Sequence, residues 1–105
     1  MIFDLRIYTL HPGKLPAWLK MYEEHGHPTQ VKHCGEPVFY ATSEVGTLNQ
    51  VVHVWKYASQ AEREQKRDAL MADPAFKEYL RLSAEMGAHL NQESRILKSV
   101  SFSPL

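Results

Sequence analysis

Apolar and polar positions alternate along the first ten residues of the chain. Over Ile2–Leu10 the charged residues Asp4 and Arg6 stand between apolar neighbours. A period of two is typical of a β-strand, because successive side chains point to opposite faces of a sheet. The sequence His11-Pro12-Gly13 predicts a turn that ends this strand.

The hydrophobic spacing becomes helical after this turn. Leu15, Trp18 and Tyr22 lie three or four residues apart with polar residues between them, as in an amphipathic helix that packs on a sheet. Gly26 and Pro28 are expected to break or kink this helix, because proline cannot donate the backbone hydrogen bond that a helix interior needs.

Two strands are predicted in the middle of the chain, Pro37–Ser43 and Leu48–Tyr57. Both are rich in β-branched and aromatic residues, and Gly46 lies in the link between them, so the pair predicts an antiparallel hairpin. Large side chains occupy both alternating sets of Leu48–Tyr57. Neither face of the predicted sheet therefore looks suited to water.

Two helix starts and a last strand are predicted in the second half. Ser59-Gln60-Ala61-Glu62 is a capping box, and the polar helix that it starts carries a charge run, Glu64–Arg67, that is expected to be a solvated face. Asp73-Pro74 begins another helix, since aspartate caps free amides and proline loses nothing at the first helical position. Its apolar stripe runs from Phe76 to Leu90. A last strand is predicted over Glu93–Phe102.

The order strand, helix, strand, strand, helix, strand predicts an α+β, ferredoxin-like βαββαβ antiparallel sheet whose helices cover one face. The whole chain, 1–105, is expected to be one domain. Because the other face would be bare and apolar, we expect a homodimer joined sheet to sheet. Such a dimer would enclose Arg6 with the aromatic side chains of Tyr8 and Trp55, which is typical of a ligand pocket.

Composition excludes several classes of protein. Twelve Lys and Arg balance twelve Asp and Glu, so the chain lacks the positive field with which nucleic-acid binders gather phosphate. No apolar run approaches the length that spans a membrane, and no nucleic-acid or membrane partner is expected. Cys34 is the one cysteine, and it cannot form an internal disulfide. A cytoplasmic location is the expectation.

Four segments resemble the NIPSNAP family within the dimeric α/β-barrel superfamily. They are Leu5–Lys14, Leu48–Tyr57, Gln92–Leu97 and Ser103–Leu105. The resemblance covers essentially the whole chain and implies a ferredoxin-like protomer that forms a dimeric α/β barrel. It implies no particular reaction, because members of the family lack an agreed enzymatic activity. The wider superfamily includes cofactor-independent monooxygenases and haem-degrading enzymes.

The candidate ligand-binding residues are Arg6, Tyr8, His53 and Trp55, which lie in the two longest of these segments. They could bind an anionic or carbonyl-bearing molecule such as an aromatic or keto acid without a cofactor, and oxygenase or isomerase activity is one hypothesis for the reaction. In the competing interpretation Arg6 pairs with Asp4 or Glu93 and Trp55 fills the core. The protein would then be a non-catalytic interaction or structural homodimer.

A metal site is a weaker hypothesis. His25, His27, His33 and Cys34 carry suitable donor atoms, but residues two apart on a helix do not share a face, and the spacing is not that of structural zinc motifs. No metal is expected. Cys34 could act as a nucleophile only with an oriented base beside it, and a passive thiol is the preferred interpretation. The chain has no glycine-rich phosphate loop, HExxH or GxSxG motif.

Overall fold

The chain forms one four-stranded antiparallel sheet. The computed structural model describes all residues, 1–105. The strands lie in the order β2-β3-β1-β4, with every neighbouring pair antiparallel. This topology confirms the predicted α+β, ferredoxin-like fold. The strands are β1 (Ile2–Leu10), β2 (Phe39–Thr42), β3 (Gln50–Tyr57) and β4 (His89–Lys98).

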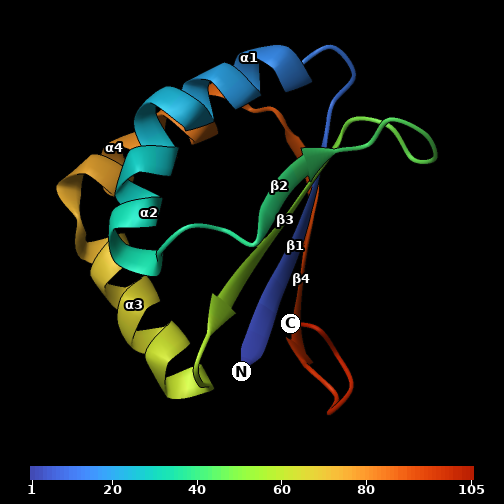
Figure 1. Cartoon of the computed structure of the whole chain (residues 1–105). Coiled ribbons are helices and arrows are strands. Elements are labelled where there is room, and N and C mark those ends of the chain that lie inside the picture. The colour runs from blue at the N-terminus through green and yellow to red at the C-terminus, as the bar shows by residue number, and fades with distance from the viewer.

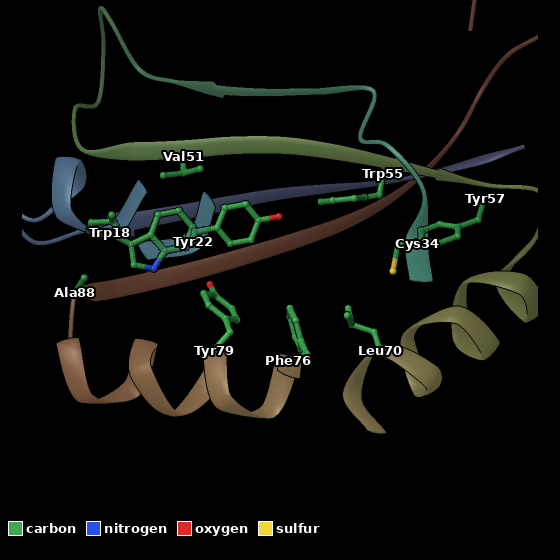
Figure 2. Packing of buried hydrophobic residues seen from close by; sticks show 11 residues of the cluster. Trp18, Tyr22, Cys34, Val51, Trp55, Tyr57, Leu70, Phe76, Tyr79 and Ala88 are labelled. Atoms are coloured by element: carbon green, nitrogen blue, oxygen red, sulfur yellow. The ribbon is translucent and has the colours of Figure 1, made fainter. Parts of the chain in front are cut away.

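All helices lie on one side of the sheet, and the opposite face is free of secondary structure (Figure 1). The helical segments are α1 (Leu15–Met21), a π-helical turn (Tyr22–Gly26), α2 (His27–Cys34), α3 (Gln60–Ala72) and α4 (Pro74–Met86). Because the helices meet the sheet at its ends and arch over its middle (Figure 1), large side chains are needed to fill the space between the layers. Figure 2 shows that aromatic rings from both layers do so.

Both predicted helix starts are confirmed. The Ser59 Oγ accepts a hydrogen bond from the backbone N–H of Glu62 at 3.1 Å, and the Glu62 carboxylate accepts one from the backbone N–H of Ala58. At the next helix the Asp73 Oδ1 accepts from the backbone N–H of Ala75 at 2.9 Å. These bonds satisfy amides that have no partner inside the helix.

The first helix is not broken at Gly26 and Pro28. Instead, one π-helical turn joins α1 to α2, and the backbone N–H of His27 donates to the carbonyl of Tyr22 five residues earlier. A π turn relaxes the helix where Pro28 would clash with the carbonyl four residues before it. Gly26 serves a different purpose here, because a Cβ at this position would lie 2.9 Å from a ring carbon of Tyr79.

The predicted bounds of the last strand were wrong. Gly87 adopts a left-handed conformation with φ 61° and caps α4, so the helix ends at Met86 and does not continue to Leu90. β4 then begins at His89 and ends at Lys98, four residues earlier than predicted at both ends. Of its ten residues, nine are exposed. Exposed side chains need not alternate between apolar and polar along a strand, and the prediction depended on such an alternation.

Candidate functional site

The four candidate residues come together, but on the other face of the sheet from the one expected. In the register of β1 with β3, Arg6 lies opposite His53 and Asp4 lies opposite Trp55. His53 and Trp55 are each 1% exposed, because the helices cover them. The expectation that a sheet-to-sheet dimer encloses these residues is therefore wrong: they lie inside one protomer, between sheet and helices.

A cavity of about 210 Å³ lies between these two layers. Arg6, Tyr8 and His53 line it, whereas Trp55 does not and instead lies beside His53 in the same strand. Two arginines and no carboxylate reach the cavity wall. The wall combines aromatic rings with groups that can donate hydrogen bonds: Arg6, Tyr8, Tyr22, Gln30, Tyr40, His53, Arg67, Tyr79, Ser83, His89 and Gln92, with Met71, Phe76 and Leu80 completing it.

Asp4 lies at the centre of a group of hydrogen bonds beside the cavity. Its side chain is fully buried and accepts hydrogen bonds from Arg6 Nε at 3.3 Å, Arg63 Nε at 3.0 Å and Ser94 Oγ at 2.9 Å. Burial alone would raise the pKa of Asp4, but the Arg6 charge, Ser94 and Arg63 together hold it below its usual value. Arg6 also donates to the Tyr8 hydroxyl at 3.2 Å. The Arg6–Asp4 pair of the competing interpretation is present, but it lies inside one protomer beside the cavity and not in a dimer interface.

Arg67 is the guanidinium without a carboxylate. It extends from α3 to the cavity, and no acidic side chain lies within 4.0 Å of it, in contrast to Arg6 and Arg63. Burial and the neighbouring Arg6 charge lower the pKa of Arg67. The expectation of a wholly solvated charge run on this helix was wrong at this residue. Arg63 and Arg67 are four residues apart and so share one helical face. This spacing is the sequence feature from which an inward position of Arg67 could have been predicted.

His53 is held by three aromatic neighbours. Its Nδ1 accepts a hydrogen bond from the Trp55 indole Nε1–H at 2.7 Å. The ring stacks on Tyr40 with centroids 4.4 Å apart and meets the edge of Tyr8 at 4.8 Å. Burial and the charge of Arg6 lower the pKa of His53 to about 3, so the imidazole is neutral at pH 7. Its Nε2 has no partner within the chain.

Two further buried polar atoms, on residues that line the cavity, have no partner in the chain. They are the Tyr40 hydroxyl and the His89 Nε2. Burial lowers the pKa of His89, so this ring is also neutral at pH 7. Sequence reasoning missed Tyr40 and His89, along with Arg67. His89 lies at the first position of β4, where the predicted strand had not yet begun.

The residues weighed as metal ligands have other neighbours. His33 Nε2 lies 2.8 Å from an Asp73 carboxylate oxygen, and His27 Nδ1 lies 3.3 Å from the Tyr22 hydroxyl. His25 is exposed and Cys34 is buried in the core. No three His, Cys, Asp or Glu side chains are grouped to hold a metal ion. No helix is long and apolar enough to cross a membrane.

Solved structures include several with this fold. A NIPSNAP family protein with unknown function from Agrobacterium tumefaciens superposes with a TM-score of 0.91 at 38% identity, covering 100% of this chain and 93% of that one. An uncharacterized NIPSNAP domain protein from Burkholderia xenovorans gives 0.92 at 30% identity, covering 99% of both. A putative antibiotic biosynthesis monooxygenase from Nitrosomonas europaea gives 0.68 at 9% identity, covering 95% of this chain and 99% of that one. At that identity the likeness shows the fold alone.

Sequence comparison gives the same relationship. The NipSnap homolog of Dictyostelium discoideum is 35% identical over 77 residues, which are 73% of this chain and 34% of that protein. NipSnap homolog 2 of Danio rerio is 31% identical over 99% of this chain and 35% of its own length. The chain therefore spans about a third of these relatives. The NIPSNAP family model matches residues 3–104, and the chain belongs to the NIPSNAP family.

Proposed function

We propose that the cavity between sheet and helices binds a small organic acid that carries a carbonyl oxygen, such as an aromatic or keto acid. The observation that carries this proposal is the imbalance at the cavity wall, which has two arginines and no carboxylate. Arg6 is paired with Asp4, but Arg67 is a partly buried cation without a counter-ion, and an anionic ligand would lower the cost of its burial. The aromatic rings in the wall offer an apolar surface to the rest of the ligand.

Arg67 is the residue that we assign to the ligand carboxylate. Arg6 already donates to Asp4 and Tyr8, so its guanidinium is only partly available. The Arg67 guanidinium has no such partner, and arginine can hold a carboxylate with two parallel hydrogen bonds. This assignment replaces the sequence-based emphasis on Arg6.

Calorimetric titration with benzoylformate, an aromatic 2-oxo acid, tests the proposal. We expect Arg67→Gln to weaken binding at least tenfold, because hydrogen bonds to charged groups contribute about 1.5–3 kcal/mol each. Lys66→Gln is the matched control: it removes one positive charge from the same helix, at an exposed residue that pairs with Glu62. Equal binding by both variants, or no binding of any acid in a broad panel, would contradict the proposal.

Oxygenase or isomerase activity remains a prediction. Both reactions can start by removal of a proton from the carbon next to a carbonyl, and the neutral His89 imidazole at the cavity wall is our candidate for the base. Proton NMR of phenylpyruvate in D2O tests this step, since a base in the cavity would accelerate exchange of its C3 protons. His89→Gln should remove the acceleration. An exchange rate equal to that in buffer alone would show that the protein does not catalyse this step, and only the binding proposal would remain.

The bare face of the sheet supports a second element of the proposal, a homodimer. Its side chains include Leu5, Ile7 and Val52, with Phe39 47% and Leu97 45% exposed at its two edges. Glu93 and Arg95 form an ion pair on the β4 side of this face, and exposed apolar side chains gathered on the rest of it are uncommon on a monomer. We propose that a second copy of the chain covers it. Sedimentation equilibrium should give the mass of a dimer at micromolar concentration, and a stable monomer would contradict the proposal.

A further inference from the structure

The position of the proton on His53 follows from the partner of its other nitrogen. An indole N–H is a donor and cannot accept a hydrogen bond. Because Trp55 Nε1 lies 2.7 Å from His53 Nδ1, this nitrogen must present a lone pair. In the neutral ring the single proton is then on Nε2, the atom that has no partner within the chain.

The surroundings of His53 prevent the ring from turning over. Tyr40 stacks on one face and Tyr8 packs its edge against the ring, while the side chain is almost fully buried. The charged groups around it are Arg6 and Asp4 from β1 and Arg67 from α3, and they place more positive than negative charge beside the imidazole. A second proton on the ring is therefore disfavoured as well.

We propose that Trp55, which does not itself line the cavity, sets the ligand specificity of the site by holding His53 as a hydrogen-bond donor. The cavity then prefers a 2-oxo acid over the 2-hydroxy and 2-amino acids of the same skeleton. This inference rests on the proposed function and adds to it the chemical class of the group next to the carboxylate. Trp55 is a positioning residue, since it acts on the ligand through His53.

The preference follows from what each group offers to a fixed N–H donor. A carbonyl oxygen accepts the bond with no proton of its own to place. A hydroxyl group can accept too, but its own hydrogen then depends on a neutral acceptor such as His89, because no carboxylate reaches the wall. An ammonium group meets the His53 donor and two guanidinium groups, all unfavourable. Sites that hydrogen-bond a substrate group discriminate strongly against analogues that leave a buried partner unpaired.

Nitrogen NMR of the histidine rings tests the first half of this inference without any ligand. Two-bond 1H–15N correlation spectra, with His53 assigned by its loss in His53→Gln, should show the Nε2–H form from pH 5 to pH 8. Trp55→Phe should produce a mixture of the two neutral forms. Trp18→Phe is the matched control, because Trp18 is equally buried but its Nε1 has no partner. An Nδ1–H form in the wild-type protein would overturn the inference, whether or not the variants fold.

Binding of benzoylformate, mandelate and phenylglycine, which share one skeleton, tests the second half. In the wild-type protein we expect mandelate to bind about tenfold more weakly than benzoylformate, and phenylglycine at least a hundredfold more weakly. Trp55→Phe should narrow the mandelate ratio to threefold or less, and Trp18→Phe should preserve it. Equal binding of the keto and hydroxy acids would overturn this inference alone. Failure of all three acids to bind would instead overturn the proposed function, and the specificity with it.

Discussion

The two faces of the sheet differ in how they combine polar and apolar side chains. The face beneath the helices carries a buried aspartate, two arginines and two neutral histidines beside the hydrophobic core, whereas the uncovered face carries aliphatic and aromatic side chains with the Glu93–Arg95 ion pair of β4 among them. Asp4 and Leu5 are neighbours in β1, yet the carboxylate is fully buried and the leucine is partly exposed. Burial of charge costs free energy unless the charges are paired, and Asp4 is paired with Arg6 and Arg63.

This comparison teaches that hydrophobicity alone does not identify the inside of this protein. The face under the helices is held together by specific hydrogen bonds around Asp4, whereas the bare face has exposed apolar side chains and one exposed ion pair, Glu93–Arg95. Substitutions on the two faces should therefore lower the stability of the protein in different ways.

The largest effect is expected for Asp4→Ala. This change leaves the Arg6 and Arg63 guanidinium groups without their carboxylate, and loss of one partner of a buried ion pair costs about 3–5 kcal/mol. Urea unfolding should show a loss of this size. Asp68→Ala removes an exposed carboxylate from α3 and should change the free energy of unfolding by less than about 0.5 kcal/mol. A loss below about 1 kcal/mol in Asp4→Ala would mean that the network does not stabilise the fold.

An intermediate effect is expected from pH. The pKa of His53 is about 3 in the folded protein and about 6.5 in an unfolded chain. The unfolded state therefore binds the proton more readily, and the stability contributed by neutral His53 is complete above pH 6.5 and lost as pH falls toward 3. At pH 4.5 the loss should be about 2–3 kcal/mol.

Urea unfolding at pH 7 and at pH 4.5 measures the contribution of neutral His53 to stability, as the difference between the wild-type protein and His53→Gln. Wild type should lose about 2–3 kcal/mol more than His53→Gln over this range. Both retain the acid sensitivity of His89 and Asp4, whose lowered pKa values act in the same direction. The exposed His11→Gln variant should behave as wild type. Equal acid sensitivity in wild type and His53→Gln would show that His53 protonates readily in the fold.

The smallest effect is expected when two neighbouring valines, one on each face, are replaced by threonine. Val51 lies under the helices and is 0% exposed, while Val52 belongs to the bare face. Val51→Thr should cost about 1–3 kcal/mol, because it buries a hydroxyl without a ready partner, and this cost should not depend on protein concentration. Val52→Thr should cost under about 0.5 kcal/mol in dilute solution and more as concentration rises, if a second copy covers this face. A cost independent of concentration for Val52→Thr would show that the face stays bare.

The sequence predicted which site residues lie together but not where. Alternation alone places Tyr8 two residues after Arg6 on one face, and Trp55 two after His53 on one face. The ferredoxin-like order makes β1 and β3 neighbours, and the Arg6–His53 register confirms that the two pairs lie side by side. Which face the helices cover could not be read, because large side chains occupy both sets of positions in β3.

The rest of the site depends on contacts between elements distant in sequence. Arg67 comes from a helix with a strongly polar sequence, and only the tertiary packing of α3 turns its two arginines, Arg63 and Arg67, toward the sheet. Tyr40 and His89 come from the strands at the two edges of the sheet, where local pattern is weak. The Trp55–His53 hydrogen bond joins residues close in sequence, but its effect on His53 depends on the other elements that bury the imidazole ring.

The π-helical turn explains how one continuous helical segment keeps the same side buried over its whole length. Trp18, Tyr22, Gly26, Gln30 and Cys34 are all buried and lie four residues apart. An α-helix advances about 100° per residue, so four such steps would rotate the stripe by about 160° away from the sheet. The wider turn at Tyr22–Gly26 takes up much of that angle. Deleting one residue within it would restore ordinary α-helical winding and leave Gln30 and Cys34 facing the sheet, whereas α-helical winding at unchanged length would turn both by about 100°, out of the wall and core that they complete.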